Sequence, residues 1–256
     1  MKKTLMAFLI FAWVGNVYAL TPAQESSEKE HLKHGYPSKD GVILYRQGYV
    51  LSYNTETKVA NWAAYHLSDD YLNGAEERSD DFRADEEIPE GQRAELKDYE
   101  GSGYDRGHLV PSADMKRSEE IQSESFLLTN MAPQIGIGFN RGIWKCLEEK
   151  VREDAEELGD IYVIVGPLYE QEEIKTIGDN KVRIPDRFFK IVLKDDGSEL
   201  EAYDLPNEPH SCDELPLFKT ASGDIYGKMN QEFYGNPDGP DQEDSKKGET
   251  HETKMV

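Results

Sequence analysis

The sequence predicts an α+β fold in which a mixed or antiparallel central sheet is flanked by helices. Three observations lead to this prediction. Strand-like runs separated by turn residues occur early in the chain, an almost wholly apolar run of five residues lies near its middle, and one long segment has the apolar spacing of an amphipathic helix.

The early runs are rich in aliphatic and aromatic residues. Residues 42–45 and 49–53 are expected to be strands, and residues 54–57 (Asn-Thr-Glu-Thr) form a turn into a third strand over 59–67. Short connections between neighbouring strands favour an antiparallel meander.

Two further groups of strands are expected later in the chain. Residues 161–165 are almost all apolar and end at a Gly-Pro pair, a pattern typical of a central strand buried on both faces. Residues 187–193 and 199–205 are joined by Asp195-Asp196-Gly197, which is a turn signal.

The clearest helix is expected from Asn140 to about Leu158. Ile143, Leu147 and Val151 recur four apart, and charged residues fill the positions between them. A second helix is expected to begin near Ser118.

The two ends differ from the body of the chain. Residues 1–19 combine two lysines, a short apolar run and a small residue at Ala19, which predicts a signal peptide cleaved after Ala19. The alternative is a membrane anchor, but the apolar run is shorter than the roughly 20 residues that a bilayer requires. Residues 20–38 are polar and are expected to form a mobile linker, 39–235 a single domain, and 236–256 an acidic disordered tail. A secreted or periplasmic protein without membrane association after cleavage is therefore expected.

Charge and cysteine content restrict the function. With 29 Lys and Arg against 51 Asp and Glu, the formal net charge is −22. Such a charge disfavours nucleic-acid or membrane binding through a general basic field, although it does not exclude an enzyme that contacts one phosphate. The two cysteines, Cys146 and Cys212, leave a disulfide open, and no Cys/His cluster supports a structural zinc site.

The stretch from Gly101 to Pro111 is the first with catalytic character. It contains Asp105-Arg106-Gly107-His108, in which an imidazole follows an arginine between glycines that permit tight turns. A histidine and an arginine placed in this way can bind a phosphate. The alternative is an exposed loop with an incidental histidine.

A second stretch lies about twenty residues further on. It contains Asn130-Met131-Ala132-Pro133-Gln134 and then Asn140, Trp144 and Glu148, which would form an i, i+4, i+8 stripe on a helix. The alternative role of Asn140 is that of an ordinary helix N-cap, and Trp144 is expected to belong to the core.

These residues resemble the signature of the DNA/RNA non-specific endonucleases, the family of the Serratia-type nuclease and endonuclease G. The tetrad 105–108, the segment 130–134, Asn140-x-x-x-Trp144-x-x-Leu147-Glu148 and residues 166–169 follow in the family's order, and the resemblance extends from about Tyr49 to Leu217. It implies a ββα-metal active-site motif.

The resemblance also implies roles. His108 stands at the position of the general base and Asn140 at that of the ligand of one Mg²⁺, for which Mn²⁺ can substitute. Glu148 matches the acid that holds a metal-bound water, and Asn130 matches an asparagine that supports the site. Arg106 is expected to contact or position the phosphate.

Two arginines of one loop compete for the position of the family arginine that stabilises the phosphorane. Arg78 aligns with it, and Arg83 is the competing choice in the same loop. Asp105 is expected to orient its turn, and the other five histidines receive no role. One departure from the Serratia-type pattern is that Gln134 and Asn140 are six apart instead of five.

The sequence thus predicts a metal-dependent endonuclease that cuts DNA and RNA without base specificity and leaves 5′-phosphate and 3′-hydroxyl ends. Phosphodiester hydrolysis requires a base, positive charge at phosphorus and neutralisation of the leaving oxygen, and the expected residues supply each. A catalytically idle acidic binding protein and a phosphodiesterase for small substrates remain as alternatives. The oligomeric state is left open.

Overall fold

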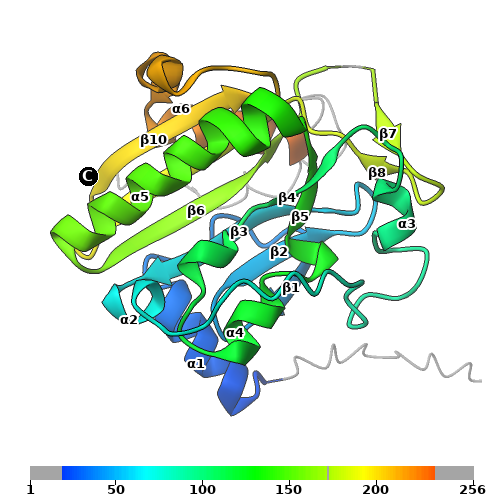
Figure 1. The fold of residues 1–256 in the computed structure, drawn as a ribbon. Helices are drawn as coiled ribbons and strands as arrows, with labels where there is room; N and C mark the ends of the chain where they lie inside the picture. The colour runs from blue at the N-terminus through cyan, green and yellow to red at the C-terminus, as the bar shows by residue number, and fades with distance from the viewer. Residues whose placement is uncertain (1–18, 172, 234–256) are drawn as a thin grey trace, which may run out of the picture.

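The computed structural model describes residues 19–171 and 173–233, which are arranged around a seven-stranded sheet (Figure 1). The strand order is β1-β2-β3-β6-β9-β10-β11, and each adjacent pair is antiparallel. The strands are β1 Val42–Tyr45, β2 Val50–Asn54, β3 Val59–Leu67, β6 Ile161–Leu168, β9 Arg187–Lys194, β10 Glu199–Pro206 and β11 Lys219–Thr220. The predicted α+β class and the early meander are confirmed.

Strand β6 is the fourth of the seven strands, and all eight of its residues are buried. This confirms the prediction of a central strand, but the strand continues through Gly166-Pro167 to Leu168. Strand β3 pairs with β6 only as far as Val165, so Pro167, which lacks an N–H, lies beyond that partner.

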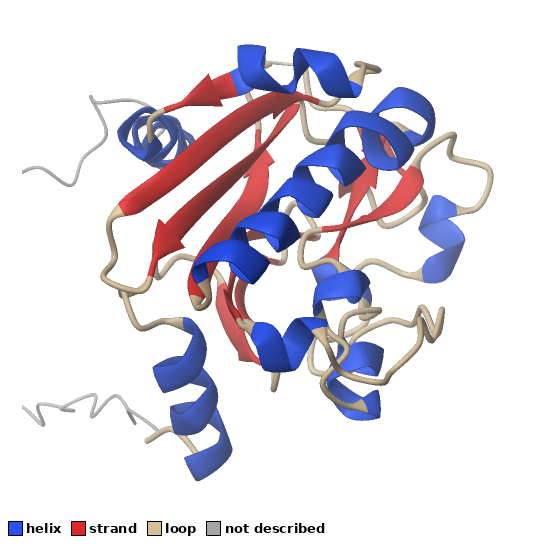
Figure 2. Ribbon diagram, turned by 60° about the vertical axis from the view of Figure 1, so that its left-hand side comes forward, coloured by secondary structure: helices blue, strands red, loops and turns tan. Residues whose placement is uncertain are grey.

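The sheet carries helices on both faces (Figure 2). The helices are α1 Pro22–His31, α2 Asp69–Leu72, α3 Leu96–Tyr99, α4 Glu119–Glu124, α5 Trp144–Leu158 and α6 Ser222–Phe233. Side chains of α5 belong to the larger core cluster on one face, and Ile225 and Met229 of α6 belong to the smaller cluster on the other. The long helix that crosses the sheet in Figure 1 is α5.

Two strands outside the main sheet and helix α5 form a small ββα unit. Strand β4 (Asp105–His108) pairs antiparallel with β5 (Met131–Gln134), and the chain then reaches α5 through the irregular helical segment η3 (Gly136–Ile143). The unit has the ββα order that the family resemblance implies. The tetrad therefore lies on a strand rather than in a loop.

The predicted helix from Asn140 to Leu158 is correct only from Trp144 onward. Gly138 has φ +86°, and Gly142 also departs from helical dihedrals, so the chain before Trp144 is not a regular helix. At Gly138 a Cβ would lie 2.5 Å from Cβ of Pro209, so glycine is required there both for its conformation and for its close approach. The second expected helix does begin after Ser118, whose side chain caps α4.

The prediction of a mobile linker over 20–38 is wrong for α1. Thr21 and Gln24 form a capping box, and Ser27 and His31 are buried against the body of the protein. The sequence pattern does not reveal this helix, because polar bonds rather than an apolar face attach it to the protein. For example, Ser27 Oγ donates to the Arg46 carbonyl at 2.6 Å. The predicted signal peptide falls largely on residues 1–18, and that segment and the predicted tail at 236–256 lie outside the described residues.

Short elements complete the fold. They are the strand pair β7 Thr176–Ile177 and β8 Val182–Arg183 and the 3₁₀ segments η1 Ser112–Asp114, η2 Leu128–Asn130 and η4 Cys212–Phe218. Across residues 19–171 and 173–233, none of the helices combines the length and the apolar character that a membrane span requires.

Candidate active site

An open cavity of about 670 Å³ lies beside the ββα unit. Its walls come from the loop before β4, from β4 itself, from η1, from η3 and from α5. Five of the six predicted site residues line it: Arg78, Arg106, His108, Asn140 and Glu148. The imidazole and the amide on which the predicted chemistry depends therefore share one cavity.

Strand geometry places Arg106 and His108 together. They are two apart on β4, so both side chains project from the same face. Between them, Gly107 faces Gln134 of β5, and a Cβ on Gly107 would lie 2.1 Å from the Gln134 side chain. In the strand register Gly107 pairs with Ala132, and only glycine leaves room for the Gln134 side chain, which explains the third residue of the tetrad.

The His108 ring is packed against aromatic side chains. It makes edge contacts with Phe82 and Phe126, whose centroids are 5.6 and 5.0 Å away, and its Nε2 is buried without a hydrogen-bond partner among the described residues. Burial, reinforced by the charges of Arg78 and Arg106, lowers the pKa of His108 to about 3. The imidazole is therefore neutral at physiological pH and can accept a proton.

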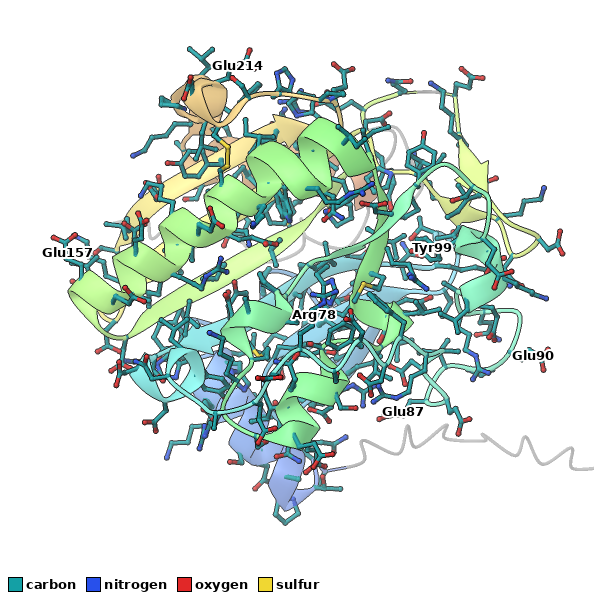
Figure 3. All side chains as sticks on the ribbon, viewed as in Figure 1. Arg78, Glu87, Glu90, Tyr99, Glu157 and Glu214 are labelled. Atoms are coloured by element: carbon teal, nitrogen blue, oxygen red, sulfur yellow. A yellow bond between two sulfur atoms is a disulfide. The ribbon has the colours of Figure 1, made fainter. Side chains whose placement is uncertain are left out.

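The two arginines stack on the same aromatic pair. The guanidinium carbon of Arg106 lies 4.1 Å from the Phe82 ring centre, and that of Arg78 lies 4.8 Å from the Phe126 ring centre. Arg78 also donates to Ser112 Oγ at 2.8 Å and pairs with Asp80 at 2.7 Å. In Figure 3 Arg78 occupies the middle of the face, whereas Glu87 and Glu90 lie at its periphery.

Arg83, the alternative to Arg78, points elsewhere. Its guanidinium bonds to Asp81 and to the Ser123 carbonyl, both at 2.9 Å, and it lines a neighbouring hollow instead of the cavity of His108. The geometry thus favours Arg78 over Arg83 as the loop arginine that shares the cavity of His108.

Asn140 is oriented by Asp105. The amide nitrogen of Asn140 donates to Asp105 Oδ2 at 2.9 Å, which leaves the amide oxygen available as a ligand. Asp105 also pairs with Arg141 at 2.9 Å. Asp105 therefore orients a functional side chain as well as its own turn. Asn140 is not the N-cap of α5, because that position belongs to Ile143.

Asn130 does not reach the cavity. It is fully buried, and its side chain bonds to the backbone of Val110 in both directions, at 3.0 and 2.9 Å, and to the Ser125 carbonyl at 2.9 Å. This geometry suits the expected supporting role of Asn130, since the side chain is buried and lies outside the cavity lining. Its side chain fixes the backbone at Val110, two residues after His108.

Glu148 lies on α5, one turn after Trp144, and lines the cavity. Burial raises the pKa of its carboxyl group to about 7, and the charge of Lys190 acts in the opposite direction. Nearby, Asp114 accepts hydrogen bonds from Tyr65 and from Arg152, each at 2.9 Å. Arg152 lines the cavity too.

A disulfide between Cys146 and Cys212 ties α5 to η4, which resolves the question that the sequence left open. The bond is visible in Figure 3 between α5 and the segment that carries Glu214. The residues just before Cys212 hold η3: Asn207 accepts from Ile135 N–H at 2.9 Å, and His210 N–H donates to the Gly138 carbonyl at 3.1 Å. The loop of Asn140 is thus supported from the far end of the chain.

Sequence reasoning missed several residues of the site. Arg152 could have been found, because it follows Glu148 by four residues on a helix and so faces the same side. Phe82, Phe126, Asp114 and Lys190 lie far apart in the sequence, and no local pattern marks them.

Oxygen atoms dominate the potential metal ligands of the cavity. Asn140 and Glu148 supply amide and carboxylate oxygens, which suit a hard divalent cation such as Mg²⁺. Within the part of the chain that the structure describes, no group of three or more His, Cys, Asp or Glu side chains is arranged to hold a metal ion. A metal bound here would take few ligands from the protein, which is usual for Mg²⁺ because it retains much of its water.

Comparisons with known proteins agree with this geometry. The family model of the DNA/RNA non-specific endonucleases matches residues 27–228. A nuclease of Syncephalastrum racemosum is 40% identical over 198 residues, covering 69% of this chain and 62% of the relative. Mitochondrial endonuclease G of Caenorhabditis elegans is 36% identical over 207 residues, covering 75% and 66%. The chain thus spans slightly less than two thirds of the length of these two relatives.

A solved structure extends the similarity to the fold. A chain in the crystal structure of the EndoG/EndoGI complex superposes with a TM-score of 0.75 at 32% sequence identity, covering 83% of this chain and 91% of that chain.

Proposed function

Because the chain belongs to the DNA/RNA non-specific endonuclease family, we propose that it is a metal-dependent endonuclease that hydrolyses phosphodiester bonds of DNA and RNA without base specificity. The observation that carries the proposal is the convergence of His108, Arg78, Arg106, Asn140 and Glu148 on one cavity.

His108 acts as the general base in this proposal. Its imidazole, which lines the cavity, takes the proton of the attacking water. A base with a pKa near 3 would be weak, but a bound phosphodiester places negative charge beside Arg78 and Arg106 and offsets their effect. Bound substrate would therefore oppose the share of the lowering that the two arginines cause, while burial, the larger cause of the low pKa, remains.

Arg78 and Arg106 bind the phosphate in this proposal. Their stacking on Phe126 and Phe82 restricts both guanidinium groups before substrate arrives, so little reorganisation is required when negative charge develops at phosphorus. These contacts are to the backbone of the nucleic acid, which every sequence shares, and this supports cleavage without base specificity.

Asn140 and Glu148 hold the metal side of the site. Asn140 can offer its amide oxygen because Asp105 occupies its amide nitrogen, and Glu148, which lines the same cavity, would hold water beside a bound ion. When bound, Mg²⁺, or Mn²⁺ in its place, supplies positive charge to the phosphate and to the leaving 3′ oxygen. Breaking of the P–O3′ bond, with a proton from solvent taken up by the leaving oxygen, would give 5′-phosphate and 3′-hydroxyl ends.

Export of the protein is part of the proposal. The composition of residues 1–19 supports a signal peptide cleaved after Ala19, and the Cys146–Cys212 disulfide suits an oxidising compartment outside the cytosol. The intact mass of protein recovered from the periplasm or medium tests this: a chain beginning at Leu20 is expected, and a chain that retains residues 1–19 contradicts it.

The nuclease proposal is tested by digestion of supercoiled plasmid and RNA with Mg²⁺, Mn²⁺, Ca²⁺ or EDTA. Cutting of both substrates with Mg²⁺ and its loss in EDTA are expected, and Asn140→Ala is expected to reduce the rate by more than about a hundredfold. A His108→Ala protein should also be inactive. Asn54→Ala, which changes a similar side chain in a turn far from the cavity, serves as the control.

The same assay separates the alternatives. Binding of nucleic acid without cutting would identify an idle binding protein. Hydrolysis of bis-p-nitrophenyl phosphate without plasmid cleavage would identify a phosphodiesterase for small substrates.

A further inference from the structure

Arg78 lies on a loop whose backbone has little support of its own. Residues 77–82 belong to no helix or strand, and they make no backbone–backbone hydrogen bond among the residues that the structure describes. The Arg78 side chain is 50% exposed, and its partner Asp80 lies two residues away on the same loop with 64% of its side chain exposed. A bond within the loop cannot fix Arg78 relative to His108. Contacts with other elements are needed for that.

Ser112 of η1 provides such a contact. Nη1 of Arg78 donates to Ser112 Oγ at 2.8 Å, and among the described residues no other element accepts a hydrogen bond from this arginine. The Phe126 ring also contacts the guanidinium, with its centre 4.8 Å from the guanidinium carbon. Because a hydrogen bond depends on distance and angle more sharply than stacking on a ring does, Ser112 restricts the position of Arg78 more closely than Phe126 does.

The hydroxyl of Ser112 is itself held in place. Ser112 is 6% exposed, and its carbonyl accepts from Nε2 of Gln122 at 2.8 Å and from the Met115 N–H at 3.1 Å. Gln122 is a buried residue of α4 and also donates to the Met115 carbonyl at 3.1 Å. Helix α4 thus fixes both ends of the short turn on which Ser112 lies.

The same turn is joined to His108 by a constrained stretch of chain. Ser112 follows His108 by four residues, and Val110 between them bonds to the Asn130 side chain in both directions, at 3.0 and 2.9 Å. Arg78, His108 and Ser112 all line the cavity. A hydrogen bond to Ser112 therefore fixes Arg78 relative to the histidine as well as to η1.

We propose that Ser112 is a positioning residue of the active site, whose hydroxyl accepts a hydrogen bond from Arg78 and holds that guanidinium in a fixed place beside His108. The inference rests on the proposed function, in which Arg78 binds the phosphate. Ser112 acts on the reaction through Arg78.

A double-mutant cycle on the whole protein tests the inference. The variants are Ser112→Ala, Arg78→Ala and the double variant, and kcat and KM are measured on duplex DNA at saturating Mg²⁺. Ser112→Ala is expected to lower kcat by about tenfold, because a guanidinium that is no longer held is poorly aligned. KM is expected to change by less than about threefold, because Arg78 keeps its charge. In the Arg78→Ala background the same change is expected to alter kcat by less than about twofold.

Ser27→Ala is the matched control. Ser27 is also 6% exposed, and its hydroxyl also makes one hydrogen bond to another element, to the Arg46 carbonyl at 2.6 Å, but it does not line the cavity. Loss of one buried hydrogen bond is expected to lower the unfolding temperature by a few degrees in both variants. Only Ser112→Ala is expected to lower kcat, so a general loss of stability does not explain the effect.

Two results overturn the inference alone while the wild type cleaves nucleic acid. One is a kcat of Ser112→Ala that equals that of Ser27→Ala. The other is an equal loss of kcat in the wild-type and Arg78→Ala backgrounds, which would show that Ser112 acts on a group other than Arg78. If Ser112→Ala does not fold, Ser112→Cys is judged by the same criteria. A wild-type protein that does not cleave nucleic acid overturns the proposed function and this inference with it.

Discussion

His108 and Glu148 line the same cavity, yet burial moves their pKa values in opposite directions. The pKa of the histidine falls to about 3 and that of the glutamate rises to about 7, because burial penalises the charged form of each. At neutral pH the imidazole is unprotonated, whereas the carboxyl group is near its midpoint. Of these two groups, Glu148 therefore sets the acidic limit of activity.

The expected pH dependence follows from Glu148. Activity requires its carboxylate in our proposal, so kcat should fall as the pH falls through about 7 or, with the metal charge close by, somewhat below it. A pH–rate profile of the wild type and of Glu148→Gln checks this. The glutamine variant should lose the acidic limb from its residual activity. An identical limb in both proteins would assign it to another group.

Arg78 and Arg83 offer a direct comparison of two arginines from one loop. Arg78 lines the cavity and stacks on Phe126, whereas Arg83 bonds to Asp81 and the Ser123 carbonyl away from it. Arg78→Ala is expected to reduce kcat/KM on DNA by about a hundredfold or more, and Arg83→Ala by less than about threefold. Steady-state kinetics on both variants, with unfolding temperatures as a check of folding, test the assignment. The reverse order would place Arg83 at the phosphate.

At the scale of elements, α1 is attached through a histidine that uses both ring nitrogens. His66 N–H donates to Nδ1 of His31 at 3.2 Å, and Nε2 of His31 donates to the Gln47 carbonyl at 2.9 Å. This arrangement requires the neutral ring. Burial accordingly lowers the pKa of His31 to about 4.

Acid should therefore weaken the attachment of α1. The unfolded chain binds a proton at His31 below pH 6.5, and the folded chain does so only below about pH 4, so stability falls as the pH falls between these values. Between pH 7 and pH 5 the loss from His31 alone is about 2 kcal/mol of unfolding free energy. Urea unfolding at both pH values checks this, and His31→Gln is expected to reduce the difference. An unchanged difference would show that His31 is not the group responsible.

The Cys146–Cys212 disulfide joins two elements that are 66 residues apart in the chain. Closing a loop of this length removes entropy from the unfolded chain, so the Cys146→Ser, Cys212→Ser double variant is expected to lose about 2–4 kcal/mol of unfolding free energy. Because η4 and the residues before it also support the loop of Asn140, the Mg²⁺ concentration for half-maximal activity should rise. Denaturant unfolding and Mg²⁺ titration measure the two effects. A stability loss with unchanged Mg²⁺ dependence would separate the disulfide from the site.

At the scale of the whole molecule, substrate binding has to overcome a net charge of −22. Several arginines and Lys145 line the cavity of an otherwise acidic protein. Attraction of the phosphate backbone therefore depends on a small number of short-range contacts.

Salt is therefore expected to inhibit cleavage. Raising NaCl from 50 to 200 mM at constant Mg²⁺ should lower kcat/KM on duplex DNA by about tenfold to a hundredfold, the range for a small number of phosphate contacts. Hydrolysis of bis-p-nitrophenyl phosphate, which offers one phosphate, is the comparison and should change far less. Equal effects of salt on both substrates would point to inhibition of the chemistry rather than of binding.

The sequence alone was sufficient for the features that depend on local pattern. The three early strands, the buried strand β6 and helix α5 from Trp144 onward follow from residue periodicity, which backbone geometry converts directly into a buried face. The residue types at 105–108, 140 and 148 likewise led to the proposed chemistry, because a base, a cation and oxygen ligands suit metal-dependent cleavage of a phosphodiester.

Only the tertiary structure decided which distant residues meet. The helix α1 lacks an apolar stripe and is held by polar bonds to Arg46, Gln47 and His66. The irregular segment before Trp144 depends on Pro209 and Asn207, which lie about 70 residues further along the chain. The aromatic support of Arg78 and Arg106 and the burial of Lys190 against Trp144 arise in the same way. Burial and distance determine charge state, and both are properties of the closed sheet and its packed helices, which no local stretch of sequence contains.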